Sequence, residues 1–318
     1  MKRATSFGPK VRLGVVATAL AALAACGGGG GGGGGPDLID LTSANRDSVS
    51  HAAGVSLVAL GASNSIPVLG GPGGVAVLRN MARAARERPM ALISLPPQSC
   101  AVSGRTLLTL DDRNGNGQLD LSEPVTIVFE ACQDDAHNVL NGTAVLTITG
   151  GSQTSFSATM TMSQFSQQAT NGRHGMTLDG TLDLSCAQLS SMSMRCTSSA
   201  ITPVRTALRT HLFSDTVTLE QGFVEDATYD DGTGHTMSTV RGTITSSAAG
   251  GAFAVSTDTS IGRLYADAYP HEGRIRVSGN RGTMVITPQS AAQVKVELDP
   301  TDDGVFESSE VEDWDWLL

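Results

Sequence analysis

The segment from Asp112 to Glu123 places oxygen-bearing side chains at spacings that suit a divalent cation. Ca²⁺ is a hard cation that takes roughly six to eight oxygen ligands, and a twelve-residue loop supplies them from positions 1, 3, 5, 7, 9 and 12. In this first acidic loop those positions are Asp112, Asn114, Asn116, Gln118 (through its backbone carbonyl), Asp120 and Glu123. We therefore predict a calcium site here. The alternative is an Asn- and Gly-rich hairpin turn with solubilising carboxylates.

A second segment near the end of the sequence, Asp299 to Glu310, repeats the spacing with weaker ligands. In this second acidic loop the candidate ligands are Asp299, Thr301, Asp303, Glu307 and Glu310. Thr at position 3 is a poorer ligand than Asp or Asn, so the prediction of calcium is weaker here. Both ions would be mainly structural, because a cation that binds only the folded chain stabilises it by mass action.

The first acidic loop resembles an EF-hand loop at every key position, but its flanks differ from that family. An EF-hand loop leads into a helix, whereas here Pro124 follows the loop and Val125 to Phe129 has the pattern of a strand. We therefore expect an EF-like loop between two strands. Whether Glu123 binds an ion through both carboxylate oxygens stays open, because a helix normally delivers that carboxylate.

The amino terminus has the pattern of an export signal. Four basic residues lie within the first twelve, and Val11 to Ala25 is largely apolar but too short to span a bilayer comfortably. The segment ends in Leu-Ala-Ala-Cys, which resembles a bacterial lipobox with Cys26 as the lipidated residue. That resemblance implies cleavage after residue 25 and a lipid anchor in a membrane. An ordinary secretory signal with a chance cysteine is the alternative.

Nine consecutive glycines, Gly27 to Gly35, follow the predicted lipidation site. Such a run behaves as a flexible coil with a reach of roughly 15–18 Å. In lipoproteins an Asp directly after the lipidated Cys favours retention in the inner membrane, and Gly27 occupies that position here. The resemblance therefore implies anchoring in the outer membrane.

Four cysteines remain after Cys26, and an even number in an exported chain predicts disulfides. Three pairings are open; we favour the two between sequence neighbours, Cys100–Cys132 and Cys186–Cys196. A zinc site made from these cysteines is disfavoured because no C-x-x-C pair occurs.

Alternation of apolar and polar residues with a period of two dominates the chain beyond Cys100. Short alternating runs are separated by turn signals such as Asn141-Gly142 and Gly250-Gly251. This pattern predicts a mainly β fold, a large antiparallel meander that is curved, sandwich-like or barrel-like. One or two short helices are expected before it, one capped by Asp47 or Ser48 and one over residues 75–88. The predicted organisation is a signal peptide (1–25), a lipidated Cys and tether (26–36), an Ala/Gly-rich partly helical segment (37–98) and the β domain (99–318).

Composition excludes several function classes. Without the first 25 residues the chain has 17 basic against 31 acidic residues, a net charge of −14, which disfavours binding to nucleic acid. The sequence has no G-x-S-x-G, H-E-x-x-H or Walker A motif, so no enzymatic activity is predicted. The six histidines are scattered. His235 and the His271-Glu272 pair could assist chemistry, but histidines in loops usually have no functional role, so none is predicted for them.

The order of Cys, acidic loop, Cys and amphipathic strands resembles a diffuse set of uncharacterised proteobacterial lipoproteins, for which no activity is implied. The sequence thus predicts a membrane-anchored extracytoplasmic lipoprotein that serves as a calcium- and disulfide-stabilised structural or interaction module. The alternative is a periplasmic carrier that holds a lipid or another apolar ligand on a curved sheet lined by Phe156, Met160 and Met162.

Overall fold

The computed structural model describes residues 36–54, 93–94, 96–115, 120–133, 138–152, 154–170, 172, 174–210, 214–230, 232–267 and 269–317. The chain divides into two compact units, Met1–Gly35 and Pro36–Leu318, and all described residues belong to the second. The predicted signal peptide, Cys26, the glycine run and the predicted helix over residues 75–88 lie outside the described residues.

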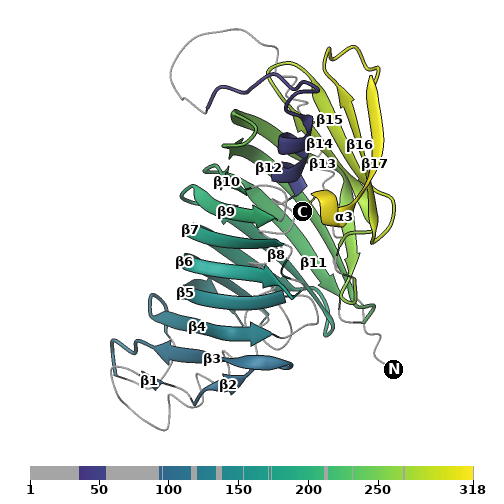
Figure 1. The fold of residues 1–318 in the computed structure, drawn as a ribbon. Coiled ribbons are helices and arrows are strands. Elements are labelled where there is room, and N and C mark those ends of the chain that lie inside the picture. Colours follow the sequence, from purple (N-terminus) through teal and green to yellow (C-terminus); the bar gives the residue numbers. More distant parts are fainter. Residues whose placement is uncertain are drawn as a thin grey trace, which may run out of the picture. The chain divides into compact units, whose positions relative to one another are not determined.

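The described part of the second unit is mainly β, as predicted, and its strands form one antiparallel sheet (Figure 1). The strands are β1 (Ile93–Ser94), β2 (Gln98–Ser99), β3 (Ser103–Leu110), β4 (Pro124–Gln133), β5 (Asn138–Gly151), β6 (Ser155–Ala169), β7 (His174–Gln188), β8 (Ser193–Ala200), β9 (Val204–Thr210), β10 (Ser214–Leu219), β11 (Val224–Asp230), β12 (His235–Ser246), β13 (Gly251–Leu264), β14 (Glu272–Ser278), β15 (Thr283–Pro288), β16 (Gln293–Asp299) and β17 (Ser308–Asp313). A four-residue helix, α3 (Trp314–Leu317), follows β17.

The sheet is a meander in which most strands pair with their sequence neighbours. From β3 to β7 and from β12 to β17 each strand pairs with the next one along the chain. Between these two runs, β8 and β9 lie end to end beside β7, while β10 pairs with β9 and β11 pairs with β8. Among the described strands, β17 pairs with β16, and β3 pairs with β1, β2 and β4.

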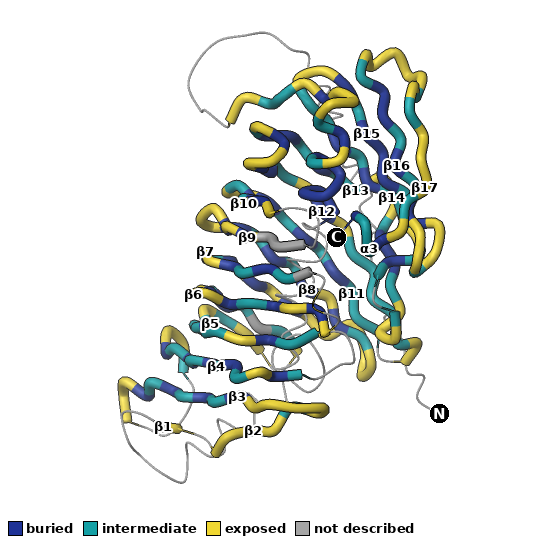
Figure 2. Tube along the Cα trace, in the orientation of Figure 1, coloured by how far each residue is buried: buried dark blue, intermediate teal, exposed yellow. Residues whose placement is uncertain are grey.

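Alternating side chains explain why these segments form strands that bury one face. In β4 the apolar side chains of Val125, Ile127 and Phe129 are buried, whereas Thr126 and Val128 between them are partly exposed. Successive side chains of a strand point to opposite faces, so a period of two places Val125, Ile127 and Phe129 together on the core side. Figure 2 shows the same alternation of buried and more exposed residues along several strands.

Bulges at matched positions bend the neighbouring strands β3 to β6. Ala131 and Gln164 have positive φ angles of 48° and 46°, and the register shifts at both positions. Opposite each bulge lies a glycine: a Cβ on Gly104 would lie 2.0 Å from the carbonyl oxygen of Ala131, and one on Gly142 would lie 2.2 Å from that of Gln164. Glycine is therefore required at these two positions, because any side chain would collide with the bulged backbone.

Residues from both ends of the second unit complete the core. Leu41 and Val49 from its start and Trp314 and Leu317 from its end are buried in the same cluster as the side chains of the sheet. The tryptophan-containing end is thus docked on the sheet. A backbone hydrogen bond also holds the first residues of the unit against the sheet: the amide of Ile39 donates to the carbonyl of Ala252 on β13 over 2.8 Å.

The first helix begins earlier than the sequence suggested. It covers residues 46–54 of the described chain, and the amide of Val49 donates to the carbonyl of Asn45, so Asn45 occupies the cap position. Asp47 and Ser48, predicted as caps, lie inside its first turn. The Asn45 side chain instead accepts a hydrogen bond from the amide of Thr42, which fixes the turn before the helix. Among the described helices, none has the length and apolar character that crossing a membrane requires.

Candidate metal centres

The first acidic loop connects β3 to β4, two strands, as its flanks predicted. Its first residue, Asp112, is fully buried at the end of β3, and its carboxylate accepts a hydrogen bond from the amide of Gly115 over 2.7 Å. The side-chain amide of Asn114 donates to the carboxylate of Asp120 over 2.7 Å. The structure thus brings these three predicted ligands to one loop, while the predicted ligands Asn116 and Gln118 lie outside the described residues.

Glu123 is the last residue of the first acidic loop and is only 3% exposed. One oxygen of its carboxylate accepts the amide of Arg113 over 3.0 Å, and the other accepts the amide of Asp120 over 2.9 Å. Two buried carboxylates, Asp112 and Glu123, therefore bracket the loop. A tight turn in which Ser122 has a φ of 70° delivers Glu123, where an EF-hand would use a helix.

The second acidic loop has the same setting, because it connects β16 to β17 and begins with a buried aspartate. Asp299, Asp303 and Glu307 each offer one carboxylate oxygen to a cluster in which these atoms lie within 4.8 Å of one another. Three oxygens this close could hold a metal ion. Thr301 lies beside them and donates its hydroxyl to Glu307 over 3.2 Å.

Backbone amides hold the Asp299 carboxylate in its ionised form. Burial of this carboxyl raises its pKa, but hydrogen bonds from the amides of Gly304, Thr301 and Asp302 and from the Thr301 hydroxyl outweigh burial and leave the pKa below its ordinary value. A carboxylate that stays ionised at neutral pH is available to a cation.

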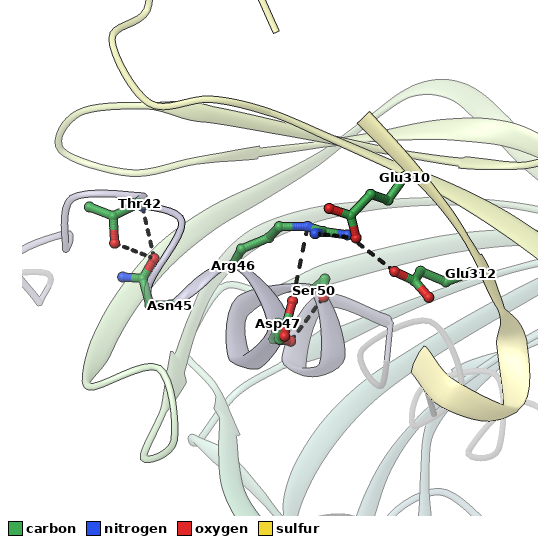
Figure 3. Close-up of polar contacts among 7 residues, drawn as sticks. All are labelled: Thr42, Asn45, Arg46, Asp47, Ser50, Glu310 and Glu312. Atoms are coloured by element: carbon green, nitrogen blue, oxygen red, sulfur yellow. Dashed lines mark hydrogen bonds and ion pairs between the residues drawn. The ribbon is translucent and has the colours of Figure 1, made fainter. Parts of the chain in front are cut away.

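Glu310, the last predicted ligand of the second acidic loop, is not part of this cluster. It lies on β17, and its carboxylate is 2.7 Å from Nη1 of Arg46 on the first helix (Figure 3). The hydrogen bond and the charge of the guanidinium lower the pKa of Glu310. The neighbouring Glu312 accepts from Nη2 of Arg46 over 3.4 Å, yet burial and the adjacent Glu310 raise its pKa. These residues bind the start of the unit to its last strand.

Both favoured disulfides are present. Cys100–Cys132 links the segment after β2 to β4 and encloses the first acidic loop within its 32-residue separation. Cys186–Cys196 joins directly paired residues of β7 and β8 across a separation of 10. Neighbouring Cys residues that flank hairpins are thus a usable signal for pairing in this chain.

A further cluster of potential ligands joins residues that no sequence motif connects. The cluster consists of His235 on β12, His271 directly before β14, and Glu272 at the start of β14. Each residue offers one ligand atom, and these atoms lie within 4.8 Å of one another. His271 is also paired with Asp267, and its Nδ1 lies 3.2 Å from Oδ2 of that carboxylate. Sequence reasoning missed the cluster because 36 positions separate His235 from His271, and only the register of β12, β13 and β14 brings them together.

The side chains expected to line an apolar ligand site lie in the core. Met160 and Met162 on β6 belong to the main buried cluster, together with Phe129 and Phe165, whose rings pack edge to face. The side chain of Phe156 lies outside the described part of the chain. Met160 and Met162 are therefore packed by neighbouring side chains.

Three comparisons with known proteins identified no relative of this chain. No family of proteins, no curated protein and no solved structure matches the chain. Within the described residues, the fold and the clusters define an antiparallel β protein with two disulfides and two groups of side chains that could each hold a metal ion.

Proposed function

We propose that this chain is a lipid-anchored extracytoplasmic protein whose disulfide- and calcium-stabilised β unit is a structural or interaction module. The observation that carries the proposal is the pair of disulfides. Disulfides persist in oxidising compartments outside the cytoplasm, and this agrees with the export pattern of the first 25 residues.

The entry of the chain into the folded unit also supports a tethered module. The glycine run ends at Gly35, and backbone contacts to the sheet begin only a few residues later, at Leu38 and Ile39. The sequence predicts a flexible coil for this run, and a tether of that kind suits a body that moves relative to its anchor. In this proposal Cys26 carries the lipid, and the outer membrane is the destination.

Calcium is proposed as the ion of both acidic loops. Each loop offers carboxylate oxygens of the kind that Ca²⁺ prefers, and each starts with a buried aspartate at the end of a strand. The affinity expected for such an extracytoplasmic site is about 10⁻⁴–10⁻³ M. The carrier hypothesis has less support, because Met160 and Met162 are buried in the core.

Fractionation of cells that express the full chain tests the anchor. The chain is expected in the membrane fraction, and Cys26→Ser is expected to move it to the soluble extracytoplasmic fraction. Gly27→Asp is the matched control, because it keeps the lipidated Cys and is expected to shift the chain to the inner membrane. A soluble parent chain, or a Cys26→Ser variant that stays in the membrane fraction, would refute lipidation at this residue.

Calorimetric titration with CaCl₂ tests the ion. The parent chain is expected to release or absorb heat and to melt at a higher temperature in Ca²⁺, and Asp112→Ala and Asp299→Ala should each remove part of both effects. Thr283→Ala is a suitable control because the side chain of Thr283 donates to Asp302, which is not a proposed ligand, over 2.8 Å. Absence of heat and of any melting shift in the parent chain would exclude calcium from both loops.

A further inference from the structure

The cluster of His235, His271 and Glu272 lies where three consecutive strands reach the same end of the sheet. His235 is the first residue of β12 and pairs with Leu264 at the end of β13. Glu272 is the first residue of β14 and pairs with Gly262 of β13. The side chains therefore approach one another across β13, and the cluster is far from both acidic loops in sequence.

The distance between the His235 and Glu272 side chains suits two ligands of one metal ion better than a direct hydrogen bond between them. Nε2 of His235 lies 3.5 Å from Oε1 of Glu272, which exceeds the usual length of an N–H···O hydrogen bond. Two ligands bound at about 2.0–2.1 Å to a tetrahedral Zn²⁺ lie roughly 3.3–3.4 Å apart. The Nε2 atom is also inaccessible to solvent and makes no hydrogen bond within the described structure. A ligand in this position would supply the missing partner.

A carboxylate orients the second histidine as in many metal sites. Nδ1 of His271 is 3.2 Å from Oδ2 of Asp267, four residues earlier in the chain. A proton on Nδ1 is held by this carboxylate, so the lone pair of Nε2 is left for a metal. Ligating histidines commonly make such a contact, which fixes the tautomer and raises the basicity of the ligand.

Gly262 gives Glu272 the room to reach His235. A Cβ on residue 262 would lie 2.4 Å from Oε1 of Glu272 and 2.5 Å from its Cγ. The carboxylate thus crosses β13 over a residue that has no side chain. Any larger residue at this position would push Glu272 away from the histidine.

We propose that His235, His271 and Glu272 form a binding site for Zn²⁺, with Asp267 as a positioning residue. Two imidazoles and a carboxylate are a donor set that suits Zn²⁺, whereas Ca²⁺ prefers oxygen alone, so the site is chemically distinct from the acidic loops. Three protein ligands leave one position of a tetrahedral ion for water or another exogenous ligand. The proposal does not depend on the anchor or on calcium.

Metal analysis of the full chain tests this site. The chain is purified in detergent without a polyhistidine tag, saturated with ZnCl₂ in excess Ca²⁺ to occupy the acidic loops, dialysed and analysed for zinc. One zinc per chain is expected in the parent. Co²⁺ substitution is expected to give the visible absorption of a low-coordinate site, which provides a second readout of the ligands.

Variants separate this site from unspecific binding. Asp267→Asn is expected to weaken zinc binding by roughly 10–100-fold and to change the Co²⁺ spectrum, and His235→Ala to weaken binding further. Gly262→Ala should act like Glu272→Gln, since both remove the carboxylate from the ion. His174→Ala, which removes a histidine at the start of β7, should change nothing. Less than one zinc in the parent chain, or full binding in a correctly folded His235→Ala variant, would overturn the proposal.

Discussion

The two disulfides close loops of different length, and this difference predicts how much each contributes to stability. Closing a loop lowers the entropy of the unfolded chain by an amount that grows with the logarithm of loop length. For a separation of 32, that relation gives about 3.7 kcal/mol for Cys100–Cys132, and for a separation of 10 it gives about 2.7 kcal/mol for Cys186–Cys196. Removal of the first disulfide should therefore cost about 1 kcal/mol more.

Three of the four cysteines have similar surroundings. Cys132, Cys186 and Cys196 are all at most 1% exposed, whereas Cys100 is partly buried, so replacing the pairs by Ala leaves small cavities at three of the four positions. The variants are Cys100→Ala/Cys132→Ala and Cys186→Ala/Cys196→Ala, both in a Cys26→Ser background that prevents exchange with a third thiol. Urea unfolding followed by far-ultraviolet circular dichroism, in a chelator that removes Ca²⁺, gives the two free energies of unfolding.

Equal losses, or a larger loss for the shorter loop, would refute the reasoning. The stabilisation would then come from contacts of the folded state, such as the packing of Cys186 and Cys196 against Leu184 and Met194. Changes in the slope with urea would also reveal whether the variants alter the unfolded chain.

Three further predictions concern single residues. Trp314→Ala should cost about 3–5 kcal/mol in urea unfolding, because this side chain is 1% exposed and its indole donates to Ser290 over 3.1 Å. Arg46→Met should cost about 1–2 kcal/mol by the same assay and raise the pKa of Glu310 in an NMR titration, because the guanidinium holds that pKa down. Asp299→Asn should be less stable than the parent at neutral pH without Ca²⁺. Since the folded-state pKa of Asp299 is lowered, its contribution is present above the unfolded value of about 3.9 and is lost as the pH falls through the folded value. The deficit of this variant, measured by thermal unfolding, should therefore shrink below about pH 4.

The strands and the disulfides were predictable because their signals are local. Alternation along β4 and β6 identifies the buried face without knowledge of the partners, and each pair of cysteines flanks strands that follow one another in the chain. The buried end at Trp314 follows from the same logic, since large aromatic side chains in a short terminal segment must find apolar surface.

Properties that depend on register were not predictable. The bulges at Ala131 and Gln164 shift the strand register, and composition does not predict such shifts. The glycines opposite the bulges can be recognised as necessary only once the register is known. The position of Glu310 also depends on register, because a few residues of strand carry it away from the second acidic loop and toward Arg46.

The candidate zinc ligands were missed for a related reason. His235 and His271 come together only because the hairpins on either side of β13 have particular lengths. A sequence scan for ligands at fixed spacing cannot find such a site, and Gly262 between them becomes informative only when the three strands are aligned.

The contacts between the two ends of the unit set an order of assembly. His51 and Arg46 find their partners Leu317 and Glu312 only 266 positions later in the chain. A chain that emerges amino end first can pair its strands one after another, but the first helix has to wait until β17 and α3 have been made. The residues nearest the tether would then be among the last to reach their final place, and a chain truncated before β17 would leave Val49 and Leu41 without the terminal side chains that help to cover them.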